Sequence, residues 1–291
     1  MINFAKKIPI EAGWSADKKY CAITESGEKF LLRISAETRR DSRKTLHEMM
    51  KQVAALNIPM CRPVDFGECD DGVYMVQTWV DGDDLSPTLP TLPKKRQCAL
   101  GLDAGRYLRQ IHTIPAPDGR EDWANHFNAK IDRVINNYEE CDLHLENDTN
   151  IIDYITDNRH LLTNRPQSFS HGDYHVGNMM LAGGKLTIID FDRFDFGDPL
   201  AEFNRIPFSA RISPAFATGQ IRGYFEGEPP SDFFSIMLLY VACNTLASLP
   251  WAIPFGQGEI DTMRKMAQDM LSWHDDMQNP VPSWYCGGKY D

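Results

Sequence analysis

The chain has 291 residues, 42% of them hydrophobic and 24% charged, which is the composition of a globular protein with room for two domains. The net charge of −11 argues against a nucleic-acid partner, because phosphate neutralisation needs clustered Lys and Arg, but it is compatible with a cationic substrate. The chain shows no run of about 18 apolar residues, no signal-peptide segment and no C-x-x-C pair among its seven cysteines, so we expect a cytoplasmic protein without a membrane partner.

The first 80 residues alternate β-rich and helical patterns. Residues 18–34 predict a hairpin, because KKYCAIT and EKFLLRI are separated by a turn signal. Residues 41–56 predict a helix from the helical spacing of their apolar side chains, and residues 73–80 predict a strand. This part of the chain therefore predicts a small sheet with one helix.

The rest of the chain predicts mainly helices. A helical pattern begins at Lys94, after a Pro-rich connection, and stops at Pro115. Residues 231–249 are apolar on nearly every side and predict a buried helix. Three further segments have helical patterns, namely residues 123–138, 150–162 and 259–278.

The most informative stretch runs from His171 to Pro199. It contains HGDYHVGN, a Gly-Gly turn and LTIIDFDRFDFGDP. Asp173 precedes Asn178 by five residues, and Asp190 closes an apolar run that predicts a strand. Phosphoryl transfer to a hydroxyl needs an acceptor for the hydroxyl proton and oxygen ligands for Mg²⁺. These three side chains supply both kinds of group.

This stretch resembles the catalytic core of the aminoglycoside phosphotransferase and choline kinase superfamily, the small-molecule relatives of protein kinases. The family motifs H-G-D-x-x-x-x-N and I-D-F or I-D-W followed by G-D-P stand here at residues 171–178 and 189–199. Either motif alone could be an ordinary turn or a buried strand, but both in this order, separated by a hairpin-sized gap, are more specific. The resemblance is sharp at residues 171–199, moderate over residues 13–82 and architectural elsewhere.

The resemblance implies an α+β, protein-kinase-like bilobal fold. We expect a small N-lobe over residues 1–82, with an antiparallel sheet and one helix that bind the nucleotide. A larger, mainly helical C-lobe over residues 83–291 would carry the catalytic loop, the metal ligands and the region that binds the acceptor substrate.

The resemblance also assigns roles within the two motifs. Asp173 is the expected catalytic base, and Asn178 and Asp190 are the expected Mg²⁺ ligands. His171 is expected to orient the catalytic loop. Asp198, within Gly-Asp-Pro, has a structural role by family precedent.

The nucleotide site is predicted from weaker signals. Gly13 and Ser15 fit a phosphate-binding turn, although the segment is not a full G-x-G-x-x-G. The strand that ends with Gln77 and Trp79 is the expected hinge, where main-chain groups would read the base of ATP or GTP. An ordinary loop before a hairpin would give the same pattern at the turn.

A basic residue on the third strand completes the predicted nucleotide site. The family usually carries Lys there, whereas FLLRI places Arg33 at that position. Glu48, on the following helix, is the candidate partner of Arg33, although it lies away from the apolar stripe of that helix. Lys29 shares a strand face with Arg33 but is expected to be solvated, because it lies beside the turn.

The implied function is ATP- or GTP-dependent phosphorylation of a hydroxyl group on a small cationic molecule, with an aminoglycoside-type antibiotic favoured as the substrate. We expect the acceptor pocket to lie in the helical lobe and to be net acidic, and we assign no residues to it. The protein is expected to be a monomer. A metabolic kinase acting on choline, homoserine, a fructosamine or a thioribose is the alternative. A pseudokinase that only binds nucleotide is disfavoured by the intact Asp173, Asn178 and Asp190.

Overall fold

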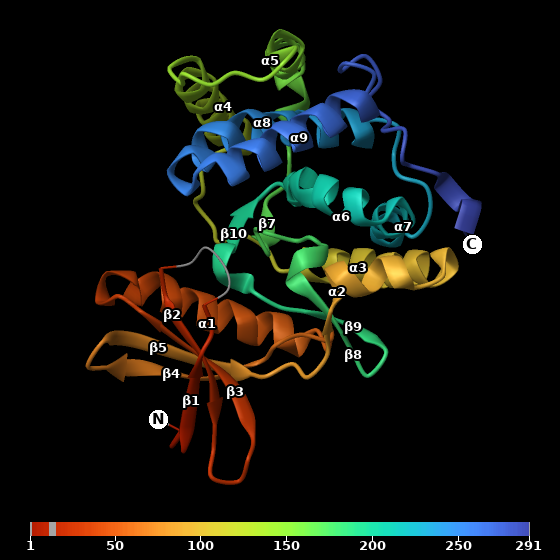
Figure 1. Cartoon of the computed structure of the whole chain (residues 1–291). Coiled ribbons are helices and arrows are strands. Elements are labelled where there is room, and N and C mark those ends of the chain that lie inside the picture. Colours follow the sequence, from red (N-terminus) through yellow and green to blue (C-terminus); the bar gives the residue numbers. More distant parts are fainter. Residues whose placement is uncertain (1, 12–15, 291) are drawn as a thin grey trace. The chain divides into compact units, whose positions relative to one another are not determined.

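The computed structural model describes residues 2–11 and 16–290 of the chain (Figure 1). The chain divides into two compact units, which are composed of Met1–Thr88 with Asn178–Phe194 and of Leu89–Gly177 with Asp195–Asp291. This division differs from the expected boundary after residue 82, because the segment that contains Asn178 and Asp190 groups with the N-terminal residues.

The first unit is built on a five-stranded antiparallel sheet with the strand order β1-β2-β3-β5-β4. Its strands are β1 (Lys6–Pro9), β2 (Lys18–Ile23), β3 (Lys29–Ser35), β4 (Pro63–Cys69) and β5 (Gly72–Thr78). Helix α1 (Arg40–Ala55) packs against β4 and β5. The predicted hairpin, helix and strand are confirmed, whereas β1 and β4 were not predicted.

Alternation along β3 gives this sheet two different faces. One face carries a small apolar core, formed by Ala22, Phe30, Leu32, Tyr74 and Val76. Arg33 and Ser35 alternate with these residues and are buried on the other face. There, Ser35 Oγ accepts a hydrogen bond from Arg43 Nε of α1 at 3.0 Å. The face that meets α1 is therefore polar at its centre.

A three-stranded sheet with the order β6-β8-β9 completes the first unit. Its strands are β6 (Asp83–Asp84), β8 (Met179–Ala182) and β9 (Lys185–Ile188), and the short helix α2 (Leu85–Thr88) follows β6. Cys61 N–H donates to Ile188 O at 3.0 Å, and Ile188 N–H donates to Pro59 O at 3.0 Å. These bonds and the pairing of β6 with β8 explain why the hairpin belongs to the first unit.

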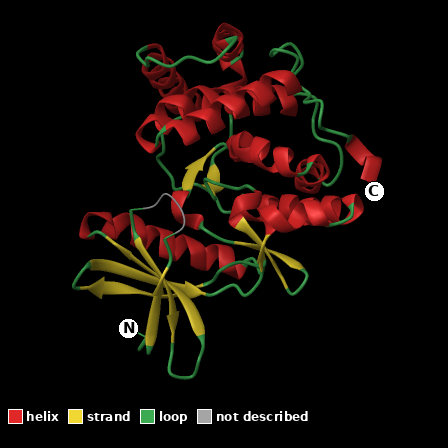
Figure 2. Cartoon of the chain, viewed as in Figure 1, coloured by secondary structure: helices red, strands yellow, loops and turns green. Residues whose placement is uncertain are grey.

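The second unit is mainly helical, as Figure 2 shows. Its helices are α3 (Lys94–Ile111), α4 (Trp123–Glu139), α5 (Asp148–Asp157), α6 (Ile206–Ile212), α7 (Pro214–Phe225), α8 (Phe233–Ala252) and α9 (Gln257–Trp273). Two short antiparallel strands, β7 (Ser168–Ser170) and β10 (Asp195–Gly197), flank the catalytic motifs. Helices α6 and α7 were not predicted, because two prolines and two glycines interrupt their sequence and α7 is buried on most sides.

Helix α8 forms the core of the second unit, as its apolar sequence predicted. Helices α4, α5 and α9 pack against it, and most of its side chains are buried. By length and composition the span Phe233–Phe255 would suffice to cross a membrane, but 67% of this window is buried inside the protein. Burial of this extent is typical of a core helix.

Helices α3 and α7 make the closest helix contact of the second unit. Each carries two glycines four residues apart, Gly101 and Gly105 on α3 and Gly219 and Gly223 on α7. A Cβ atom at any of these positions would overlap with a backbone carbonyl oxygen of the other helix. The two backbones are therefore in direct contact, which only glycine permits.

Candidate active site

The catalytic loop of the second unit begins directly after β7. His171 is fully buried, and its Nδ1 accepts a hydrogen bond from the backbone N–H of Asp173 at 3.3 Å. Gly172 adopts a left-handed backbone with φ of 84°, a conformation that favours glycine. The contact between the His171 ring and the loop backbone is the one that a loop-orienting role requires.

A buried carboxylate, Glu202, holds the same loop from the other side. Its Oε1 accepts hydrogen bonds from the N–H groups of Gly172 at 3.0 Å and of Tyr174 at 3.3 Å. Burial alone would raise the pKa of Glu202, but the nearby His112 and His171 rings and the loop N–H groups outweigh it and hold the pKa below its ordinary value. Glu202 was not predicted as a site residue.

Asp173 itself stays accessible on this fixed loop, with 20% of its side chain exposed. Its Oδ1 lies 3.2 Å from Arg205 Nε and 3.6 Å from His175 Nε2. The guanidinium of Arg205 lies over the ring of Phe208, at 5.9 Å from the ring centroid, and the His175 ring contacts Phe208 as well. Arg205 and His175 were not predicted as site residues.

The Gly-Asp-Pro motif has the structural role that family precedent gave it. Asp198 is fully buried, and Arg165 donates to both of its carboxylate oxygens at 2.7 and 3.0 Å. Tyr240 OH of α8 donates to the same carboxylate at 2.6 Å, and Leu200 N–H donates at 3.0 Å. Asp198 thus ties the segment after β10 to the core helix.

The two expected metal ligands lie at the ends of the hairpin in the first unit. Ile189 N–H donates to Asn178 O at 3.0 Å, so the backbone joins the strand that leads to Asp190 directly to Asn178. Asp190 has a left-handed backbone with φ of 62°, and 41% of its side chain is exposed. Carboxylate and amide oxygens that remain accessible are ligands that Mg²⁺ accepts, so these residues fit the implied ion.

Arg33 lies beside Asp190 but is not paired with Glu48. Its Nη2 donates to Asp190 Oδ1 at 3.1 Å. Glu48 is 55% exposed and forms an ion pair with Lys51 at 2.9 Å. The predicted pairing is therefore wrong, because Glu48 lies outside the buried face of α1.

The side chain that α1 directs toward Arg33 is another cation, Arg43. Arg43 Nη2 donates to Asp17 Oδ2 at 2.8 Å, and its Nη1 contacts Asp192. Arg33 Nη1 also contacts Asp192, and it lies 3.7 Å from Asp17 Oδ2. Burial alone would raise the pKa of Asp192, but Arg33 and Arg43 outweigh it and hold the pKa below its ordinary value.

The remaining predicted nucleotide contacts are placed only in part. Gly13 and Ser15 lie outside the described residues. Gln77 is buried near the end of β5, and its Nε2 lies 3.5 Å from Met50 Sδ. Trp79 follows the strand and is half-buried. Reading of the base at this hinge stays a prediction.

Lys29 is at the surface, as expected. It forms an ion pair with Asp81 at 3.0 Å, and both side chains are largely exposed. Of the two basic residues on that strand face, only Arg33 therefore lies beside the predicted metal ligand.

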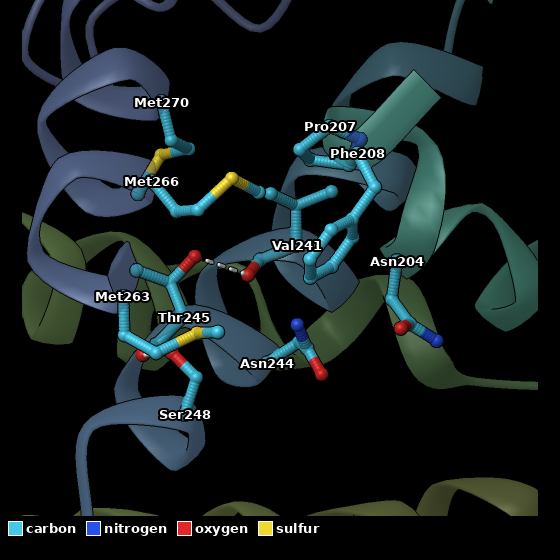
Figure 3. Close-up of a pocket in the computed structure, with 10 residues that line it drawn as sticks. All are labelled: Asn204, Pro207, Phe208, Val241, Asn244, Thr245, Ser248, Met263, Met266 and Met270. Carbon is cyan, nitrogen blue, oxygen red and sulfur yellow. Dashed lines mark hydrogen bonds between the residues drawn. The ribbon is translucent and has the colours of Figure 1, made fainter. Parts of the chain in front are cut away.

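A pocket in the second unit opens among the segment 204–208, helix α8 and helix α9 (Figure 3). Its lining consists of Asn204, Pro207, Phe208, Val241, Asn244, Thr245, Ser248, Met263, Met266 and Met270. Thr245 Oγ1 donates to Val241 O at 2.9 Å within α8. Phe208 is shared with the surroundings of Asp173, since its ring contacts Arg205 and His175.

These ten lining residues carry no charged side chain. The polar groups are amides and hydroxyls, and Met and Phe side chains supply the apolar surface. The volume of about 20 Å³ has room for little more than one water molecule, so the acidic acceptor pocket stays a prediction.

Comparison with known proteins supports a kinase assignment. The model of the family described as "Phosphotransferase enzyme family" matches residues 7–234. No curated protein matches the chain significantly in sequence. Among solved structures, the chain resembles a choline/ethanolamine kinase family protein from Mesorhizobium loti, with a TM-score of 0.69 and 16% identity over 94% of this chain and 90% of that chain.

Two further phosphotransferase structures have similar folds. The amicoumacin kinase hAmiN, in complex with AMP-PNP, Ca²⁺ and Ami, gives a TM-score of 0.65 and 16% identity over 97% of this chain and 92% of that chain. A thermostable mutant of aminoglycoside phosphotransferase APH(4)-Ia gives 0.64 and 14% identity over 92% of this chain and 94% of that chain. At such identities the likeness shows a kinase-like α+β fold, and the match over residues 7–234 shows that the chain belongs to the phosphotransferase enzyme family.

Proposed function

We propose that this phosphotransferase transfers the terminal phosphoryl group of ATP or GTP, in the presence of Mg²⁺, to a hydroxyl group of a small molecule. The observation that carries the proposal is the fixed loop around Asp173. Glu202 and His171 bind the loop backbone, while the Asp173 carboxylate stays accessible. A carboxylate held in this way can orient an acceptor hydroxyl and take its proton.

Arg205 adds a second restraint on the proposed base. Its Nε lies 3.2 Å from Asp173 Oδ1, and its guanidinium is itself held over the ring of Phe208. The contact fixes the rotamer of the carboxylate, so that an oxygen is presented to the acceptor rather than to the loop. The chain thus positions the base before the acceptor arrives.

The nucleotide would be held by the first unit. Asp190 and Asn178 would hold Mg²⁺, which when bound neutralises charge on the phosphates, and Arg33 would contact the phosphates directly. The similar amicoumacin kinase structure contains AMP-PNP and Ca²⁺, and a similar aminoglycoside 2′-phosphotransferase structure contains GDP. These structures support a nucleotide and a divalent ion without selecting ATP or GTP for this chain.

Two classes of acceptor are proposed. The net charge of −11 and the resemblance to aminoglycoside kinases favour an aminoglycoside-type antibiotic. The similar structure of a choline/ethanolamine kinase family protein supports a metabolic acceptor, such as choline, homoserine, a fructosamine or a thioribose. The cavity beside Phe208 does not separate the two classes, because its volume of about 20 Å³ admits little more than one water molecule.

A turnover screen tests both points. ADP or GDP release would be measured with Mg²⁺ and either nucleotide, against aminoglycosides, neutral sugars, choline, homoserine and fructosamines, with Asp173→Asn as the paired control. We expect one acceptor to stimulate release by the wild-type protein and not by the variant. Stimulation only by polycationic aminoglycosides would reject the metabolic acceptor, and equal rates in both proteins would reject Asp173 as the base.

A further inference from the structure

Four buried side chains of the first unit form a ring of alternating charge, and the half-buried Arg39 is joined to it through Asp17 Oδ1 at 3.0 Å. Arg33 and Arg43 are only 4% and 1% exposed. Asp17 lies 3.7 Å from Arg33 Nη1 and 2.8 Å from Arg43 Nη2. Asp192 contacts the Nη1 atoms of both arginines. We call these four residues the charge ring.

The ring joins four separate segments of the unit. Asp17 directly precedes β2, Arg33 lies on β3, Arg43 lies on α1, and Asp192 follows the expected metal ligand by two residues. Each carboxylate contacts both guanidiniums, so that removing any member leaves an unbalanced charge in a buried place. The position of Arg33 is thus set by the other three members.

The four buried members of the ring balance one another, two guanidiniums against two carboxylates. Arg39, which pairs with Asp17, and Asp190, which pairs with Arg33, add one charge of each sign at the edge of the ring. Arg33 contacts the ring through Nη1 and Asp190 through Nη2. Because 41% of the Asp190 side chain is exposed, a cation can still reach its carboxylate.

The nitrogen atoms of Arg33 have different surroundings. Its buried Nε makes no hydrogen bond with any residue that the structure describes, and Nη1 lies against the carboxylates of Asp192 and Asp17. Nη2 is the nitrogen that contacts Asp190, the expected metal ligand. A guanidinium held in this way can contact a phosphate on the side of Asp190.

We propose that Asp17 and Arg43 are positioning residues of the nucleotide site. With Asp192 they hold Arg33 for the phosphates of the nucleotide and keep the charge of Asp190 available for Mg²⁺. This inference rests on the proposed function. In this chain the helix α1 supplies a cation to the site, and the carboxylate that pairs with the strand arginine comes from Asp17.

The charge balance of the ring predicts opposite effects for two substitutions. Asp17→Asn leaves the ring with one excess positive charge, so Arg33 is held more strongly by Asp190, which it already contacts at 3.1 Å. Arg43→Met leaves one excess negative charge, so Arg33 is drawn into the ring and away from the nucleotide phosphates. The double variant restores a neutral pair of Arg33 and Asp192.

Titration calorimetry with a non-hydrolysable nucleotide tests the proposal, in Mg²⁺ and again in EDTA. For Asp17→Asn we expect a rise of about tenfold or more in Kd with Mg²⁺ and no weakening in EDTA, since one neutralised ligand removes most of the benefit of the ion. For Arg43→Met we expect weaker binding in EDTA and a smaller change with Mg²⁺. The double variant should bind the nucleotide more tightly than the sum of the binding free-energy changes of the two single variants implies.

Asp71→Asn is the matched control, because Asp71 is an exposed acid of the same unit that pairs with Lys18 at 2.9 Å. Equal weakening of a single variant in Mg²⁺ and EDTA, or no change in either, would overturn the proposal. If a single variant does not fold, the double variant, measured against wild type, decides whether a neutral ring suffices. Absence of Mg²⁺-nucleotide binding by the wild-type protein would instead reject the proposed function itself.

Discussion

The two units hold their buried carboxylates in different ways. In the first unit, Asp17 and Asp192 contact guanidiniums, and arginine stays charged at every pH that the fold tolerates. In the second unit, Glu202 accepts hydrogen bonds from neutral backbone N–H groups and lies beside histidine rings. The first arrangement holds Arg33 beside Asp190, in the proposed nucleotide site, and the second holds the loop that carries Asp173.

The difference teaches where the protein should be sensitive to acid. Arginine does not titrate in the acidic range, and Arg33 and Arg43 outweigh burial and hold the pKa of Asp192 below its ordinary value. In the second unit, burial lowers the pKa of His274 to about 4, so a proton that the unfolded chain binds below about pH 6.5 favours unfolding. We therefore expect the second unit to be the more sensitive to acid.

The sharpest way to separate the two regions is Asp173→Asn. The variant loses the proposed proton acceptor, while every residue of the first unit is unchanged, so we expect turnover to fall by about 10²-fold or more. Binding of Mg²⁺-nucleotide should survive within about a factor of two to three, because Asp173 is not among the residues proposed to hold the nucleotide. Steady-state kinetics measures turnover, and titration calorimetry measures nucleotide binding. A parallel loss of turnover and binding would show that the two units do not have the separate roles proposed here.

Acid sensitivity of the second unit is tested first at His274. Burial lowers the pKa of His274 to about 4, from an ordinary value of about 6.5. Below about pH 6.5 the unfolded chain binds a proton at His274, whereas the folded chain binds it only near pH 4. The free energy of unfolding therefore falls by about 3 kcal/mol in total as the pH is lowered over this range. Thermal melts from pH 7 to 4 should show a flatter profile for His274→Gln. The exposed His160→Gln should follow the wild type.

Glu202→Gln tests the support of the catalytic loop. At pH 7 the variant loses a charged acceptor for two buried N–H groups, which should cost about 1–3 kcal/mol of unfolding free energy. The folded pKa of Glu202 lies below its unfolded value, so its stabilisation is present above the ordinary Glu range and is lost as pH falls through the folded pKa.

The difference in the free energy of unfolding between wild type and Glu202→Gln should therefore be smaller in acid. Urea unfolding at pH 7 and pH 4 measures it, with the exposed Glu146→Gln as the control. A gap that widens on acidification would show that Glu202 is neutral in the folded protein.

The sequence predicts best those parts of the site that lie within one short stretch. Asp173, Asn178 and Asp190 are separated by fixed short spacings, and local backbone geometry joins Asn178 to the strand before Asp190. Glu202 and Arg205 escaped prediction because their contacts with the catalytic loop cross about thirty residues and no local pattern announces them.

Helix α1 shows both a missed signal and a wrong inference. Arg43 lies three residues before Leu46 and seven before Met50, which is the spacing of the buried face. Its place was therefore readable from the pattern, but a charged residue on an apolar stripe is easily dismissed as exposed. Glu48 was preferred because of its charge, although its position on the helix lies outside the buried face. In the structure this position determines the outcome, and Glu48 is exposed.

The glycine pairs of α3 and α7 also determine how these helices align. Two glycines four residues apart on each helix give a contact that is complete in one alignment only. A slip of one turn would bring a side chain against a backbone. Ala104, which lies next to Gly105, accepts a hydrogen bond from Tyr174 OH at 2.7 Å, so the catalytic loop takes its position from α3. The four glycines thus fix the alignment of α3 with α7, and through Tyr174 this alignment determines where the loop places the proposed base.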